Sequence, residues 1–177
     1  MILPAVLVTH GTFLWLSGAE WHAALNDFPP ALLVASLVFD LWGRAKSRET
    51  LVSAGYWCLN AGAATAVAAV LSGLLVEGRV EQTPTVHGLI ENHETLGIAL
   101  TVLFAALAAW RIWRRNQFSQ QEQQSYTMAA LAGTLGILWQ AHLGGTLVYR
   151  HAAGIPSDVL QGELRERADT TSRAVER

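Results

Sequence analysis

Leu51–Val76 reads LVSAGYWCLNAGAATAVAAVLSGLLV and contains no charged side chain. A helix needs about 20 mostly apolar residues to cross the hydrocarbon core of a bilayer. This stretch exceeds that length, and small residues fill its middle. It therefore predicts a membrane-spanning helix and places the chain among integral membrane proteins.

Three further stretches have similar length and character. They are roughly Trp21–Trp42, His93–Trp113 and Tyr126–Tyr149. The first contains Pro29 and Pro30 near its start, and proline is tolerated in the first turn of a helix. We therefore expect that helix to begin close to Pro29, after a bent entry. The predicted fold is all-α: a transmembrane four-helix bundle over residues 20–155.

Two shorter segments flank the predicted bundle. Residues 1–19 are apolar but interrupted by glycines, and no lysine or arginine precedes their apolar core, so they make a poor signal peptide. We expect an extra short N-terminal apolar helix that is interfacial or half-inserted, with a fifth span as the alternative. Residues 156–177 are polar and mixed in charge, which indicates a solvated helix or a disordered C-terminal tail.

The composition agrees with a membrane protein and excludes several other classes. Of the 177 residues, 51% are hydrophobic and 15% are charged, whereas about 25% of a soluble domain is charged. The net charge of −2 argues against nucleic-acid binding, which needs a basic excess. The single cysteine, Cys58, can form no intramolecular disulfide, and no Cys-x-x-Cys-His motif for covalent haem attachment is present.

Basic residues set the expected orientation, because short loops rich in lysine and arginine stay in the cytoplasm. The loops after the first and third predicted spans carry Arg44, Lys46, Arg48, Arg111, Arg114 and Arg115. The middle loop has one arginine and several acids. We expect the first and third loops in the cytoplasm and the C-terminus in the periplasm, with the chain in a bacterial inner membrane.

Most of the histidines map to the expected outer side of the bilayer. These are His22, His87, His93, His142 and His151, while His10 lies in the N-terminal stretch. Burying a histidine in the membrane costs free energy unless it has a partner, so each such histidine is a candidate functional residue. Haem b takes axial imidazoles from facing helices of a bundle. It also needs small residues at the porphyrin edge, and Gly97, Gly144 and Gly145 follow closely after two of the histidines.

We therefore predict that four histidines act as imidazole ligands to the iron of one or two b haems. They are His22, His93, His142 and His151. His142 and His151 are nine residues apart, which puts them on opposite sides of an ideal helix. That separation favours two haems over one.

Charged residues near these histidines have weaker expected roles. Arg150 and Arg79 are expected to pair with haem propionates, because guanidinium groups pair well with carboxylates. If a quinol is oxidised nearby, we expect Asp27 to transfer the proton. Asp40 lies near the inner edge of the first span, where an acidic side chain can cap the helix or snorkel to the membrane surface.

The same residues also have simpler interpretations. His22 and His151 can be polar residues at the membrane interface, and His142 can form a hydrogen bond between helices. The two adjacent glycines can allow close helix packing. A cofactor-free accessory or structural subunit of a larger complex therefore stays open. So does a zinc or copper membrane enzyme, although the sequence has no His-x-x-His or His-Glu-x-x-His pair.

Two stretches carry a resemblance to a known family. Residues 22–33 read HAALNDFPPALL, with Asp40 further on, and residues 144–155 read GGTLVYRHAAGI. They resemble the first-span and last-span motifs of the DUF2231 family of bacterial four-span membrane proteins, roughly His-x4-His-Phe-Pro and Gly-Gly-x-Leu-Val-Tyr-x-His-Gly-x-Gly-Val. His93 matches a histidine that opens the third span of that family.

The resemblance covers about Glu20–Pro156 and implies a redox-associated membrane protein similar to a b-type cytochrome of a respiratory chain. It also implies partners: a periplasmic c-type cytochrome, other redox subunits or a quinol. Two departures matter. Asp27 stands where the family has a second histidine, which removes one possible ligand, and Ala152 stands where the family has glycine. Whether the chain is an electron-transfer protein or a subunit of a membrane oxidoreductase stays open.

Overall fold

A computed structural model describes residues 17–175, and every regular element in that range is helical. The elements are α1 (Gly18–Asn26), α2 (Phe28–Ala45), α3 (Glu49–Val76), the 3-10 turn η1 (Glu77–Arg79), α4 (Pro84–Trp113), α5 (Gln120–His151) and α6 (Ser157–Val175). The predicted all-α fold is confirmed. The N-terminal helix expected over residues 1–19 lies almost wholly outside the described residues.

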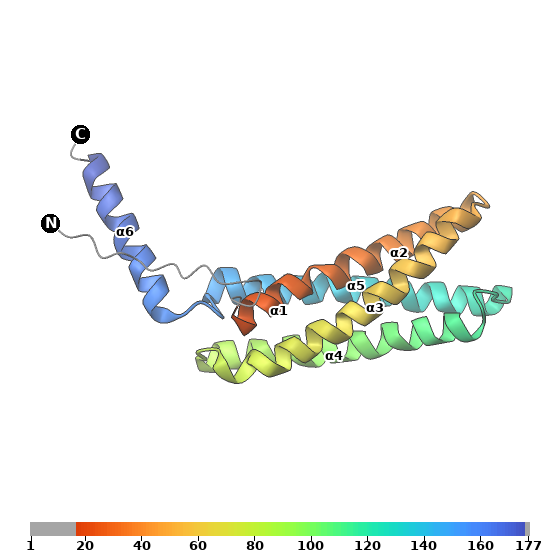
Figure 1. Cartoon of the computed structure of the whole chain (residues 1–177), viewed down its shortest axis with the longest axis horizontal. Helices are drawn as coiled ribbons and strands as arrows, with labels where there is room; N and C mark the ends of the chain where they lie inside the picture. The colour runs from red at the N-terminus through yellow and green to blue at the C-terminus, as the bar shows by residue number, and fades with distance from the viewer. Residues whose placement is uncertain (1–16, 176–177) are drawn as a thin grey trace.

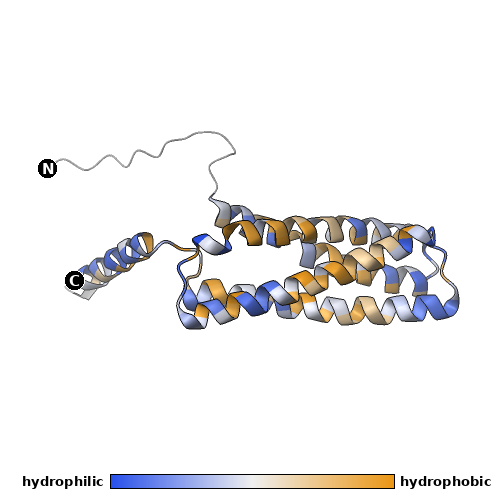
Figure 2. Cartoon of the chain, turned by 90° about the horizontal axis from the view of Figure 1, so that it is seen from below, coloured by the Kyte–Doolittle hydropathy of each residue, from blue (hydrophilic) through white to orange (hydrophobic). Residues whose placement is uncertain are grey.

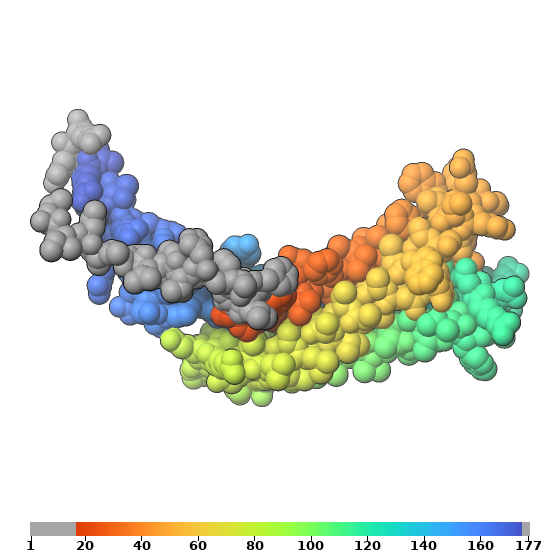
Figure 3. Space-filling model, in the orientation of Figure 1, coloured from red at the N-terminus to blue at the C-terminus, as the bar shows by residue number. Residues whose placement is uncertain are grey.

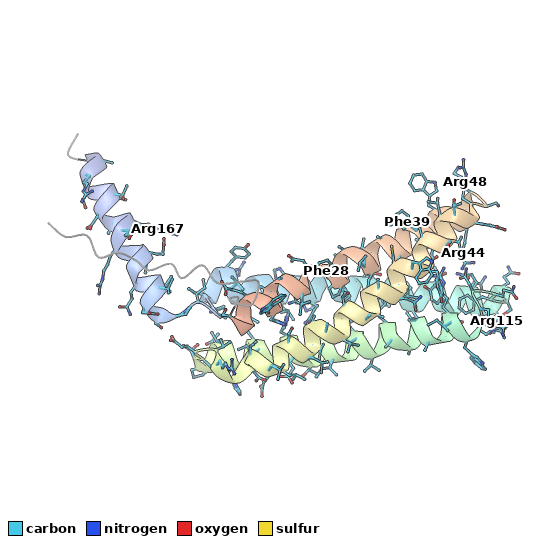
Figure 4. All side chains as sticks on the ribbon, viewed as in Figure 1. Phe28, Phe39, Arg44, Arg48, Arg115 and Arg167 are labelled. Carbon is cyan, nitrogen blue, oxygen red and sulfur yellow. The ribbon has the colours of Figure 1, made fainter. Side chains whose placement is uncertain are left out.

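Four long arms run antiparallel in one elongated, slightly curved bundle (Figures 1 and 3). The first arm is α1 followed by α2, and the others are α3, α4 and α5. We call the end with the α2–α3 and α4–α5 turns the arginine end, since Arg44, Arg48 and Arg115 lie there (Figure 4). We call the end with α1, η1 and the close of α5 the histidine end, from which α6 projects (Figure 1).

Local sequence explains where several helices begin and end. Thr83 caps α4 by accepting a hydrogen bond from the backbone of Val86, and Pro84 occupies the first turn. Ser119 and Glu122 form a reciprocal capping box at the start of α5. The entry to the first span is the helix α1, and α2 begins at Phe28, close to the predicted start.

Small residues of α3 allow it to pack closely against its neighbours. A Cβ on Gly62 would lie 2.8 Å from the Cδ2 atom of Leu33 on α2. Ala63, Ala66 and Ala69 are buried along the same helix. Since apolar side chains gain little by leaving lipid, membrane helices associate through such close packing of small residues.

The outside of the bundle is apolar. Figure 2 shows hydrophobic residues along the length of the arms and hydrophilic ones at the turns and on α6. Leu75 and Trp113 are 76% and 79% exposed, which is unfavourable in water over a wide surface and suits lipid. Among residues 17–175, three helical segments are long and apolar enough to cross a membrane: Gly18–Ala45, Glu49–Arg79 and Pro84–Trp113. The fourth arm, α5, is equally long but more polar and is not among them, so the predicted count of four spans is not fully confirmed.

Candidate functional site

Helix α1 turns the imidazole of His22 towards α3. The Nδ1 atom lies 3.1 Å from the Ala69 carbonyl oxygen and 3.0 Å from the Ser72 hydroxyl oxygen. The Ser72 hydroxyl donates its own hydrogen to that carbonyl, so both oxygens accept from Nδ1–H, and the network assigns the ring proton to Nδ1. The Nε2 atom then carries a lone pair, which the Asn26 amide approaches at 3.5 Å. Gly73 makes room for the ring, since a Cβ there would lie 3.0 Å from Cε1.

His93 on α4 is interlocked with α5 through two glycines. Its ring lies against Gly144, where a Cβ would be 3.1 Å from the His93 Cε1 atom. The side-chain amide of Gln140 lies against Gly97, where a Cβ would be 2.9 Å from Nε2, and this Nε2 donates to the His93 carbonyl oxygen at 2.8 Å. Each helix therefore supplies one polar side chain and, one turn later, the glycine that receives the side chain of the other.

The imidazoles of His22 and His93 lie in the same region of the histidine end. Both are half-buried, and they lie close enough to interact electrostatically. They come from α1 and α4, which both pack against α3. The structure thus brings together two of the four predicted ligands. Two imidazoles from different helices are the donor set that a low-spin haem takes on its two faces.

The other two predicted ligands are surface residues. His142 is exposed on α5, and its ring centroid lies 5.1 Å from that of Trp139. His151 is the last residue of α5, is exposed, and lines an open groove of about 660 Å³ between the start of α1, η1 and the turn before α6. The four histidines are therefore divided into an inner pair and two exposed residues.

The remaining predicted residues also lie at the surface or in open surroundings. Arg150 and Arg79 are exposed, and Arg79 lines the same groove. A Cβ on Gly145 would meet its nearest neighbour at 3.9 Å, an ordinary contact. Asp27 and His87 are exposed as well. Within residues 17–175, no three His, Cys, Asp or Glu side chains gather in a way that could hold a metal ion.

A buried ion pair, not predicted from the sequence, lies towards the arginine end. Arg111 on α4 is 0% exposed and donates to both carboxylate oxygens of Asp40 on α2, at 2.5 and 2.7 Å. It also donates to the Tyr126 hydroxyl on α5 at 3.0 Å, the Val52 carbonyl on α3 at 3.0 Å and the Asn116 side chain at 2.7 Å. All five N–H donors of the guanidinium are satisfied, and the cluster joins all four arms.

This cluster corrects two expectations. Asp40 neither caps nor snorkels, since it is 3% exposed, and Arg111 is a core residue rather than a loop charge. Gly55 on α3 leaves the room for the Asp40 carboxylate, with which a Cβ at that position would collide. The sequence did carry a signal: opposite charges lie near the same expected edge of two spans, and ionisable groups in a membrane pair with one another.

Comparison with known proteins gives one match. The profile of a family described as "Predicted membrane protein (DUF2231)" matches residues 18–156. No curated protein and no solved structure matches the chain.

Proposed function

The chain belongs to the DUF2231 family of predicted membrane proteins, and we propose that it is a membrane-embedded b-type cytochrome with one haem held between His22 and His93. The observation that carries the proposal is that these two half-buried imidazoles from α1 and α4 lie within electrostatic range of each other. A haem b in this place supplies a one-electron couple, so the proposed function is electron transfer.

The donor set fits such a group. The proton of His22 is held on Nδ1 by the Ala69 carbonyl and the Ser72 hydroxyl, so Nε2, which the Asn26 amide approaches at 3.5 Å, carries the lone pair for a metal. Ligating histidines commonly donate their other ring N–H to a carbonyl oxygen in this way. The buried Nδ1 of His93 has no hydrogen-bond partner in the described structure.

One haem is favoured over the two expected from the sequence. His142 and His151 are exposed, whereas a histidine that held a haem inside the bundle would be enclosed by its pocket. The haem would lie at the histidine end, where the proposed partners are a periplasmic c-type cytochrome, another redox subunit or a quinol. Arg79, in the groove at this end, and Arg150 are proposed to interact with propionates or with acidic groups of a partner.

The alternative that the structure also supports is an accessory subunit without a cofactor. The rings of His22 and His93 lie directly against Gly73 and Gly144, as helix-packing residues do in membrane proteins. Nothing in the described residues favours a zinc or copper enzyme, because no three ligand side chains gather there.

Absorption spectroscopy of the detergent-purified protein, from cells fully supplied with haem, tests the proposal. We expect the bands of a low-spin b haem after reduction and one haem per chain in a pyridine haemochrome assay. His22→Ala and His93→Ala should each remove the low-spin spectrum. The surface controls His142→Ala and His151→Ala should keep it. A colourless wild-type protein would overturn the proposal and leave the accessory subunit, and loss of haem in the two controls would restore the prediction of two haems.

A further inference from the structure

We infer that Gln140 is a positioning residue for His93 and accepts a hydrogen bond from its Nδ1–H through Oε1. The inference deepens the proposed function, because it gives the second haem ligand the partner that the first already has. Gln140 was not among the residues predicted from the sequence.

Two unpaired atoms on residues in contact carry the argument. His93 Nδ1 and Gln140 Oε1 are both buried without a hydrogen-bond partner in the described structure. Leaving a buried polar atom unpaired costs about 1–3 kcal/mol, so two such atoms on residues that already contact each other favour bonding to each other. One is a ring nitrogen that can carry a proton, and the other is an amide oxygen that can only accept.

The contacts of Gln140 already place its amide group at His93. Its Nε2 donates to the His93 carbonyl oxygen at 2.8 Å, so the unpaired oxygen belongs to an amide group that is already bonded to His93. Gly97 makes this possible, because a Cβ there would lie 2.9 Å from Gln140 Nε2. The amide thereby binds one residue twice, through its backbone and its ring.

The pairing also fixes which nitrogen of His93 is free. With the proton on Nδ1, the lone pair lies on Nε2, the same tautomer that the Ala69 carbonyl and the Ser72 hydroxyl impose on His22. The partner of a ligating histidine fixes its tautomer and raises its basicity, and removing such a partner typically costs 10–100-fold in metal affinity. A stronger acceptor should stabilise ferric iron, and loss of the acceptor should favour ferrous iron.

Variants of Gln140 in the full-length protein test the inference. For Gln140→Leu we expect about tenfold weaker haem retention and about a tenfold shift of the redox equilibrium towards the reduced form, which is about 59 mV for a one-electron couple. Gln140→Glu should shift the equilibrium in the opposite direction. Gln124→Leu, which removes an exposed glutamine of the same helix, should leave both quantities unchanged.

A measurement without haem separates this inference from the proposed function. In the ¹⁵N spectrum of the histidine-labelled apoprotein, His93 should show a protonated, hydrogen-bonded Nδ1 that changes in Gln140→Leu and not in Gln124→Leu. If wild type binds no haem but shows this change, the cytochrome proposal fails and the pairing stands. If wild type binds haem while Gln140→Leu alters neither the redox equilibrium nor the ¹⁵N signal, the pairing is wrong and the cytochrome proposal stands.

Discussion

The carboxylate of Asp40 has two arginines within its reach and pairs with the one on the other side of the bundle. Arg44 follows it by one turn on the same helix, yet the Nε and Nη2 atoms of Arg44 are buried without a hydrogen-bond partner. Asp40 instead binds Arg111 of α4 through both oxygens. A pair within one helix would stabilise only that helix, whereas this pair depends on how α2 and α4 are aligned.

Removing one partner of this ion pair should be strongly destabilising. For Asp40→Asn we expect a loss of about 3 to 5 kcal/mol, because Arg111 is left as an uncompensated charge in the core. Arg111→Met should cost a similar amount, and the double variant should cost less than the sum of the two. Thermal or denaturant unfolding in detergent measures these differences. Asp158→Asn, an exposed acid on α6, is the control, and an Asp40→Asn protein as stable as this control would contradict the structural role of the pair.

At the scale of helices, the contact between α4 and α5 is a reciprocal fit of two polar side chains into two glycine positions. Gly144 and Gly145 are adjacent in the sequence, and both were predicted to make room for a porphyrin. The structure distinguishes them: Gly144 receives the His93 ring, while Gly145 has only an ordinary contact. The sequence does not reveal this difference, because it depends on how far α5 is rotated about its axis.

Alanine at these two glycines therefore gives a matched pair of variants. In Gly144→Ala the new Cβ would lie 3.1 Å from the His93 Cε1 atom, so the ring must move by a few tenths of an ångström. We expect about tenfold weaker haem retention, in line with loss of a ligand's support, together with altered EPR signals of the ferric protein. Gly145→Ala should keep wild-type retention and signals. Equal effects of the two substitutions would show that His93 does not depend on its contact with Gly144.

For the whole molecule, hydropathy predicts where the long helices lie but not all of their limits, since α4 begins at Pro84, nine residues before the predicted start at His93, and α5 is not among the candidate spans. The apolar stretches from Leu51 and from His93 became α3 and α4, because a helix is the form in which a single segment satisfies its own backbone in lipid. The pairing of His22 with His93, and the exposure of His142, could not be predicted in this way. They follow from the rotation of four helices relative to one another, which side-chain packing decides.

The Asp40–Arg111 pair is a second feature that was not predicted from the sequence. Basic residues near span ends were all counted as loop charges, which is what the positive-inside rule uses. Arg111 is three residues before the first loop residue and is fully enclosed. A count of charges cannot distinguish such a residue from its exposed neighbours Arg114 and Arg115.

The distribution of the other basic residues still predicts how the whole molecule lies in a membrane. The arginine end should face the cytoplasm and the histidine end the periplasm, because positively charged short loops are retained inside. The α2–α3 turn contains Lys46, and the first turn of α4, at the opposite end, contains Thr85; both side chains are exposed. Single cysteines at these positions therefore report the two sides.

In a Cys58→Ser background, a membrane-impermeant maleimide applied to intact bacterial cells should label Thr85→Cys. It should label Lys46→Cys only after the membrane is permeabilised. This orientation would put the His22–His93 pair near the periplasmic surface, within reach of a soluble electron donor on that side. The opposite labelling pattern would place the pair towards the cytoplasm. It would remove a periplasmic c-type cytochrome from the proposed partners, while the proposed haem site itself would be decided by the spectrum and not by the topology.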